Sequence, residues 1–171
     1  MNMKILVSAF IYFGEDAGST HIIETWRRLA RNYEVTLLLP AQEKSARKYY
    51  EGMFPAGTVK YIAGTGRTRI RFLRKVKFVW ASFWFQLRTL LLVRAMKPDL
   101  VFVRHAYVGW SPILFSRPYL LELNGLTSGE AKSVTHDPFM RLSSGLAEKI
   151  ERKGIRRAAS IIVVTPKMKT I

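Results

Sequence analysis

Three side chains that could do chemistry lie at or near the ends of short apolar runs in the sequence. Arg104 and His105 follow the apolar run at 99–103, and Glu122 lies inside the run at 119–123. A carboxylate in an apolar strand is costly unless it is paired, so we expect Glu122 to pair with Arg104 from an adjacent strand. His105 could donate a hydrogen bond or act as a general base near neutral pH. One alternative is a surface arginine beside a histidine that only caps a loop. Another is an ion pair of Glu122 and Arg104 with a purely structural role.

A second candidate is the loop that follows the first apolar run and opens onto a helical pattern. It contains Gly14, Gly18 and Ser19. Glycine lets backbone N–H groups approach a ligand, and the N-terminus of a helix carries partial positive charge that suits phosphate. The spacing does not match the dinucleotide fingerprint G-x-G-x-x-G, and the sequence holds no G-x-x-x-x-G-K-[ST] run. A plain turn explains the same residues equally well.

Residues 67–97 are both basic and aromatic, with nine Lys or Arg and no Asp or Glu. Helical spacing places one set of apolar side chains on a single face, which we expect to pack on a sheet. These residues are Phe72, Val76, Val79, Phe83, Leu87 and Leu90. A second face beside the first carries Leu73, Trp80, Trp84 and Leu91.

The second face and the basic residues around it exceed what packing requires. A cationic, aromatic helix fits an anionic lipid surface, where Trp and Phe insert and Arg and Lys meet the headgroups. The residues expected at such a surface are Arg69, Arg71, Arg74, Lys75, Trp80 and Trp84. Ordinary packing is one alternative. Single-stranded nucleic acid is another, since bases stack on aromatic rings, but no RNA-recognition or helix-turn-helix pattern is evident.

The elements that must position these residues follow from the hydropathy pattern. Short apolar runs alternate with helical patterns, which is typical of a parallel sheet covered on both faces. The runs predict six strands, at 4–10, 34–39, 59–63, 99–103, 119–123 and 160–164. The helical patterns predict helices at 20–31, 43–50, 70–96 and 138–158. We therefore expect an α/β fold: one Rossmann-like domain with a parallel sheet of about six to seven strands.

Composition narrows the classes of function. The chain has 171 residues, a formal net charge of +16 and 49% apolar residues, which suits one folded domain and not a disordered tail. The absence of Cys excludes a disulfide scaffold, a thiolate zinc site and a cysteine nucleophile. The three His are far apart in the sequence, so we expect no metal site. No run reaches the roughly 18 uncharged apolar residues that a membrane-spanning helix needs. We expect a cytoplasmic protein.

With these residues placed, the chain resembles the N-terminal domain of a GT-B glycosyltransferase of the retaining family 4 type. Four stretches carry the resemblance: residues 4–21, 97–104, 118–125 with Glu130 after them, and 158–165. Their order and spacing match that domain over nearly the whole chain. One departure is that Gly14 and Gly18 are separated, whereas the family usually has two adjacent glycines.

The resemblance implies that residues 1–171 form an acceptor-binding domain, and that the nucleotide-sugar site belongs to a second, C-terminal domain outside this sequence. It assigns catalytic contact with the transferred sugar or its acceptor to His105 or His21. The residues it places on the acceptor side are Arg104, Glu122, Asn124 and Glu130, and those facing the donor diphosphate are Gly14, Gly18 and Ser19. No metal or other cofactor is implied, because basic side chains of the second domain neutralise the diphosphate.

The expected function is transfer of a sugar from a nucleotide sugar to a lipid-linked or cell-envelope glycan. The protein would work at the inner face of the cell membrane, with its donor domain supplied in cis or in trans. The 171 residues alone would then be inactive. Two alternatives stay open: a non-catalytic α/β binding module, and a basic domain that binds nucleic acid.

Overall fold

The computed structural model describes residues 3–10, 17–40, 47–48, 51–55, 57–62, 71–105, 109–123 and 138–163. Its strands are β1 (Lys4–Phe10), β2 (Glu34–Pro40), β3 (Val59–Ile62), β4 (Leu100–His105), β5 (Tyr119–Leu123) and β6 (Ser160–Val163). Its helices are α1 (Ala17–Leu29), α3 (Arg71–Met96), α5 (Pro138–Arg157) and the short 3-10 helix η1 (Ser111–Leu114). The helix expected at 43–50 falls largely outside the described residues.

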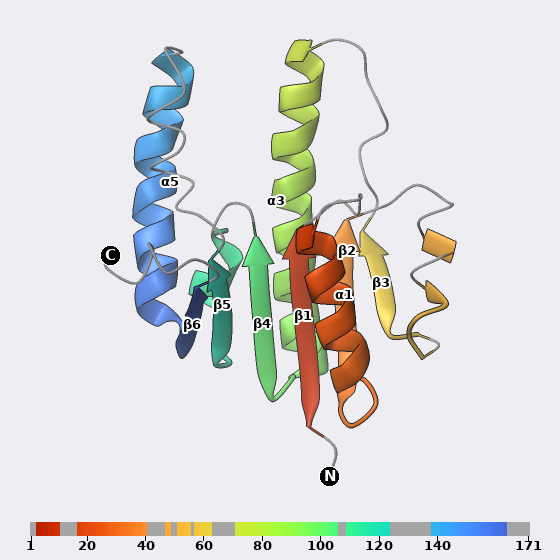
Figure 1. The fold of residues 1–171 in the computed structure, drawn as a ribbon. Helices are drawn as coiled ribbons and strands as arrows, with labels where there is room; N and C mark the ends of the chain where they lie inside the picture. Colours follow the sequence, from red (N-terminus) through yellow and green to blue (C-terminus); the bar gives the residue numbers. More distant parts are fainter. Residues whose placement is uncertain are drawn as a thin grey trace.

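The six strands form one parallel sheet with the order β3-β2-β1-β4-β5-β6 (Figure 1). β1 pairs with β2 on one side and with β4 on the other, so the strand order reverses between β1 and β4. Every strand expected from the sequence is present, and the Rossmann-like α/β fold is confirmed. In open sheets of this kind, ligands bind at the carboxyl ends of the strands beside such a reversal.

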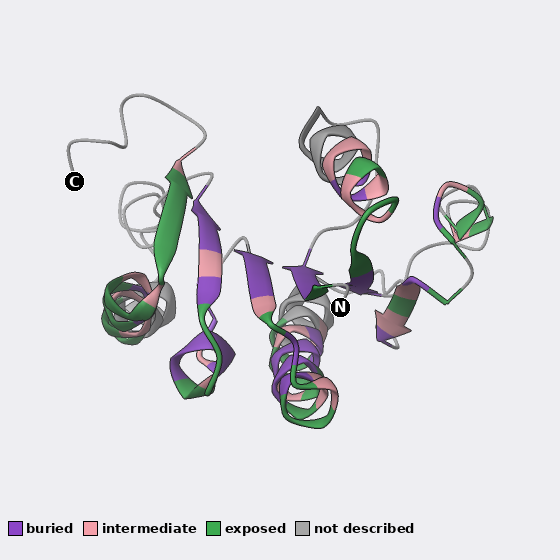
Figure 2. Cartoon of the chain, turned by 90° about the horizontal axis from the view of Figure 1, so that it is seen from below, coloured by how far each residue is buried: buried purple, intermediate pink, exposed green. Residues whose placement is uncertain are grey.

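Helices cover both faces of the sheet. Figure 2 shows α1 on one face and α3, η1 and α5 on the other. On the α1 face, Trp26 packs edge-on against Phe102 of β4, with ring centroids 4.7 Å apart. On the opposite face, Phe85 of α3 packs edge-on against Phe10 of β1 at 5.1 Å. Because the central strands are buried on both sides, they read as continuous apolar runs, which is why the sequence predicts them.

The face of α3 that meets the sheet differs from the expected one. Val79 and Phe83 were expected on the packing face, but both are exposed. The core instead contains Ala81, Phe85 and Val93 of this helix. The prediction from apolar spacing is therefore wrong for the middle of α3.

A buried polar contact explains the difference. The hydroxyl of Thr89 in α3 lies 2.9 Å from the hydroxyl of Ser8 in the central strand β1, and it also donates a hydrogen bond to the Phe85 carbonyl. Buried hydroxyl groups need partners. Ser8 therefore favours the rotation of α3 that turns Thr89 toward the sheet. Leu90, next to Thr89, is buried as expected. Apolar periodicity alone does not detect a polar pair of this kind.

α3 is longer than the sheet is deep. Its 26 residues span about 39 Å, whereas a seven-residue strand spans about 23 Å. Figure 1 shows α3 and α5 extending past the arrowheads of the strands, which mark the carboxyl edge of the sheet. Among the described side chains of α3, Ala81 is the first that lies in the core.

α3 ends where the sequence predicts. Lys97 follows the helix with a left-handed backbone, at a φ of 48°, and Pro98 comes next, which cannot continue a helix.

Over the described parts of the chain, no helix combines the length and the apolar character needed to cross a membrane.

Candidate functional site

Arg104 and Glu122 form an ion pair near the carboxyl edge of the sheet. Arg104 Nη1 lies 3.1 Å from Glu122 Oε1, and both residues are buried. Strands β4 and β5 are neighbours, with Val103 paired to Leu121, so the next residue of each strand stands beside the other. The ion pair expected from the sequence is confirmed.

Both charged side chains point to the α1 face of the sheet. Side chains alternate between the two faces along a strand, and Phe102 and Leu120 pack in the core on the α1 side, two residues before Arg104 and Glu122. The sequence predicts that Arg104 follows the fourth strand. In the structure Arg104 lies within β4, because the pairing of β4 with β1 continues through Arg104 and His105. The main-chain hydrogen bonds of the sheet therefore hold the backbone of Arg104.

Burial turns this pair into a fixed arrangement of charges. A charged group loses hydration when it is buried, so each partner is tolerated because the other is present. A guanidinium offers five N–H donors in one plane, and a carboxylate accepts hydrogen bonds. Such a pair can orient the hydroxyl groups of a polar ligand at the edge of the sheet.

The backbone of His105 ends β4 beside Phe10, the last residue of β1. This is the point where the strand order reverses. His21 lies in α1. The side chains of both histidines lie outside the described part of the chain, and so do Asn124 and Glu130 altogether. The backbone of His105 thus adjoins the ion pair, while the roles of these four residues stay predictions.

Helix α1 begins at Ala17, earlier than the expected start at Thr20. Gly18 and Ser19 therefore belong to the first helical turn and not to a preceding loop. The first four N–H groups of a helix have no partner within the helix, and they carry the partial positive charge that favours an anion. Gly14, the third member of the expected phosphate-facing group, lies outside the described residues.

Three large rings on α3 form an exposed surface, which we call the aromatic cluster: Trp80, Phe83 and Trp84. Trp80 is 61% exposed, and Val79 beside it is 67% exposed. The rings of Trp80 and Trp84 stack with centroids 6.2 Å apart and an interplanar angle of 7°. The guanidinium of Arg88 lies 5.9 Å from the centroid of the Trp84 ring. Both tryptophans are thus exposed, as the lipid-surface prediction requires.

The basic residues expected at the same surface are only partly described. Arg69 lies outside the described residues. For the first residues of α3 the helix is described but the side chains are not: Arg71, Phe72, Leu73, Arg74, Lys75 and Val76. Further along the same helix, Arg88 and Arg94 are exposed.

Sequence reasoning missed Gln86, Gly109 and Ser111, which lie next to the aromatic cluster. Gln86 is buried in α3, and its Oε1 accepts a hydrogen bond from the backbone N–H of Ser111 at 2.9 Å. The available signal was an amide inside an apolar helical run, because a buried amide needs a partner. No local pattern points to where that partner lies in the sequence.

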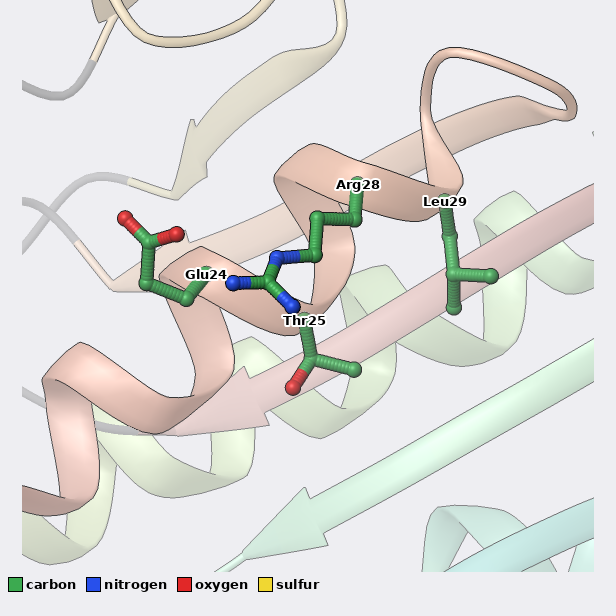
Figure 3. A pocket seen from close by; sticks show the side chains of 4 residues that line it. All are labelled: Glu24, Thr25, Arg28 and Leu29. Carbon is green, nitrogen blue, oxygen red and sulfur yellow. The ribbon is translucent and has the colours of Figure 1, made fainter.

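A hollow of about 470 Å³ lies along α1, lined by Glu24, Thr25, Arg28 and Leu29 (Figure 3). None of these residues was expected at the site, and Glu24 is already paired with Arg27 at 2.9 Å. The hollow lies in the second half of α1, away from the first turn that holds Gly18 and Ser19. In the described part of the chain, no three potential metal ligands gather closely enough to hold a metal ion.

Comparison with known proteins agrees with this arrangement. The model of the Glycosyltransferase Family 4 matches residues 18–171, which include every strand after β1 and nearly all of α1. No curated protein matches the chain. From the parallel sheet, its strand order and this match, the chain belongs to glycosyltransferase family 4.

Proposed function

We propose that this domain forms the acceptor side of the active cleft in a retaining glycosyltransferase. Membership of family 4 implies a nucleotide-sugar donor and a glycan acceptor. The observation that carries the proposal is the buried Arg104–Glu122 pair near the carboxyl edge of the sheet. It lies on β4 and β5, beside the reversal of strand order, and ligands of open α/β sheets bind at that edge.

The ion pair supports acceptor recognition because sugars present hydroxyl groups. A guanidinium donates and a carboxylate accepts, so an Arg–Glu pair can bind hydroxyl groups in a fixed orientation. We extend the acceptor side to Asn124 and Glu130, by the resemblance to the family. By the same resemblance, His105 or His21 contacts the transferred sugar or the acceptor hydroxyl.

The first turn of α1 would face the donor diphosphate across the cleft. Gly18 and Ser19 lie in this turn, where N–H groups without helical partners favour negative charge, and Gly14 precedes it. In retaining transfer the acceptor hydroxyl attacks on the face that the nucleotide leaves. Stabilising the departing diphosphate therefore matters more than a strong base, and the second domain of the family would supply most of that stabilisation.

The exposed part of α3 supports an acceptor that is lipid-linked or belongs to the cell envelope. α3 extends past the carboxyl edge (Figure 1), so the aromatic cluster stands toward the same end of the molecule as the ion pair. Each Lys or Arg near an anionic leaflet contributes about 1 kcal/mol of binding, and inserted Trp rings add an apolar contribution. The domain would then work at the inner face of the cell membrane.

The test is sugar transfer by the polypeptide of the complete reading frame, with labelled nucleotide sugars and extracted membrane lipids as acceptors. We expect label in the lipid fraction and a retained anomeric configuration. Glu122→Gln should raise the acceptor KM about tenfold or more, while donor hydrolysis without acceptor changes little. Thr89→Val, buried on the opposite face, is the control for a general loss of stability. Equal losses in both activities of Glu122→Gln, in a sample that still unfolds cooperatively in urea, would contradict the acceptor role.

Nucleic acid is the alternative partner that the stacked rings of Trp80 and Trp84 would favour. Salt-sensitive retention on single-stranded DNA, without binding to anionic vesicles, would support it over a membrane. A non-catalytic module would instead bind glycan while the complete protein transfers no sugar.

A further inference from the structure

α3 closely approaches the segment that follows β4. Gln86 Oε1 accepts the Ser111 N–H at 2.9 Å, and all three of Gln86, Gly109 and Ser111 are buried. A Cβ added to Gly109 would lie 2.0 Å from Gln86 Oε1 and 2.1 Å from Gln86 Cδ. Real side chains do not approach so closely, so the glycine leaves the space that the amide of Gln86 fills.

This contact lies between the aromatic cluster and the core. Three residues before Gln86, the Phe83 ring packs against the Trp110 ring with centroids 5.5 Å apart. Three residues after Gln86, Thr89 contacts Ser8 of β1. Residues three apart lie on one flank of a helix. One flank of α3 therefore joins the exposed cluster, the 109–111 segment and the central strand in a row.

The held segment is close in sequence to the proposed site. Gly109 comes four residues after His105, which ends β4, and Arg104 precedes His105. Gly109 and Ser111 lie against α3, so α3 holds the described segment that begins four residues after the end of β4. The same helix that carries the aromatic cluster thus holds a segment that comes shortly after Arg104 in the sequence.

We propose that Gln86 is a positioning residue for the acceptor side: it holds the 109–111 segment against α3, so that an anionic lipid surface docking on the aromatic cluster restricts that segment. The proposal rests on the proposed function, because it takes the cluster as the lipid contact and the edge near β4 as the acceptor side. Gln86 acts through the backbone N–H of Ser111 and not by touching substrate.

The first experiment measures hydrogen exchange of the Ser111 amide in single variants. Gln86→Met keeps the length of the side chain and removes the acceptor oxygen, so this amide should exchange about tenfold faster. Gln86→Glu keeps an acceptor oxygen at the same reach and should restore slow exchange. Gly109→Ala should act like Gln86→Met, since its Cβ needs the space of the amide. Unchanged exchange of Ser111 in Gln86→Met would overturn the positioning role.

The matched control is Thr89→Val, which removes a buried contact one turn further along the same helix. It should lower the melting temperature without a selective change at Ser111. If Thr89→Val and Gln86→Met speed the exchange of all amides alike, the Gln86 contact is a general stabiliser and the proposal is wrong.

The second experiment adds vesicles of phosphatidylglycerol and phosphatidylcholine. In the unmodified protein, bound vesicles should slow exchange at Ser111 about threefold or more, and Gln86→Met should abolish that response while vesicle binding persists. Bound vesicles without any change at Ser111 would overturn the coupling. A protein that does not bind vesicles would overturn the coupling together with the membrane part of the proposed function. Exchange of the Ser111 amide in Gln86→Met would still decide the positioning role.

Discussion

At the scale of single residues, the contact between Arg104 and Glu122 is a buried ion pair whose loss should lower stability. The two charges are buried in adjacent strands with 3.1 Å between Nη1 and Oε1. Removing one member breaks the ion pair and leaves the other charge buried without this partner, a change that costs about 3–5 kcal/mol. Replacing both members with apolar side chains removes that cost. The stability of the pair and its use in binding can therefore be separated.

We predict that Arg104→Met lowers the free energy of unfolding by about 3 kcal/mol or more, and that adding Glu122→Leu recovers at least half of the loss. Urea unfolding followed by circular dichroism measures both variants. The control is Arg27→Met, at the partly exposed pair with Glu24, which should change stability by less than about 1 kcal/mol. A double variant that shows the sum of two full losses would contradict the pairing.

On the face of the sheet opposite the ion pair, Tyr119 makes the free energy of unfolding depend on pH. Burial raises the pKa of Tyr119 above its ordinary value of 10.0, and the charge of Arg157 lowers it by a smaller amount. The hydroxyl donates a hydrogen bond to the Gly154 carbonyl of α5. The folded protein therefore holds this proton more tightly than the unfolded chain does. The resulting stabilisation is complete below pH 10.0 and is lost as the pH rises through the folded pKa.

Tyr119→Phe should consequently flatten the fall of stability as the pH rises above 10.0. The measurement is the midpoint of urea unfolding at several pH values in that range. Burial also raises the pKa of Tyr61. Tyr61 is present in both proteins, so its contribution to the pH dependence of stability is the same in each. If both proteins lose stability with the same slope, Tyr119 does not carry the effect.

At the scale of elements, the four central strands could be predicted because most of their residues are apolar and buried on both faces. The edge strand β6 could be predicted from its apolar residues although they are largely exposed. The end of β4 could not, because its extension to His105 depends on pairing with β1 as far as Phe10. The Arg104–Glu122 pair could also be predicted, since a carboxylate in an apolar strand needs a partner. The Gln86 contact could not, because its partner Ser111 lies in a distant segment. Hydropathy reports burial, and it does not report which buried polar groups meet.

The packing face of α3 shows the same limit, and its error bears on function. The contact of Thr89 with Ser8 fixes the rotation of the helix, and this rotation leaves Val79 and Phe83 on the surface. The exposed apolar surface of α3 is therefore larger than the sequence predicts. A membrane would bury more apolar area than the two tryptophans alone supply.

The element-level prediction concerns the depth of the aromatic cluster. With vesicles that contain brominated phosphatidylglycerol, fluorescence of Trp80 and Trp84 should be strongly quenched, because bromine quenches only rings that reach the acyl chains. Variants that keep one tryptophan each, the others being Phe, assign the signal. Trp26, which is buried against Phe102, is the internal control and should stay unquenched. Quenching of Trp26 as strong as that of Trp80 would indicate unfolding on the vesicle.

At the scale of the whole molecule, a net charge of +16 attracts any polyanion. Charge alone therefore does not distinguish a membrane from nucleic acid, and the position of the charges must do so. We predict that replacing Arg69, Arg71, Arg74 and Lys75 with Gln removes most binding to anionic vesicles, and that added salt weakens the binding that remains. Vesicle sedimentation at several salt concentrations measures this.

A matched variant with the same loss of charge tests whether position matters. It replaces four exposed basic residues elsewhere with Gln: Arg94, Lys149, Lys153 and Arg156. This variant should keep most of the vesicle binding, because its substitutions lie away from the aromatic cluster. Equal losses in the two variants would mean that only the net charge acts, and the assignment of the lipid surface to the first half of α3 would be wrong.

The last prediction concerns catalysis by the 171 residues as a separate polypeptide. By resemblance to family 4, we expect these residues to hold the acceptor side and a second domain to bind the nucleotide sugar. Each missing hydrogen-bond donor to the departing diphosphate lowers the rate about 10²–10³-fold. The polypeptide should therefore turn over no sugar nucleotide at a measurable rate. The assay is release of nucleoside diphosphate, and a cooperative urea transition of the same sample shows that the polypeptide is folded. Turnover by the folded polypeptide would place the donor site within these residues, and the division into acceptor and donor domains would be wrong.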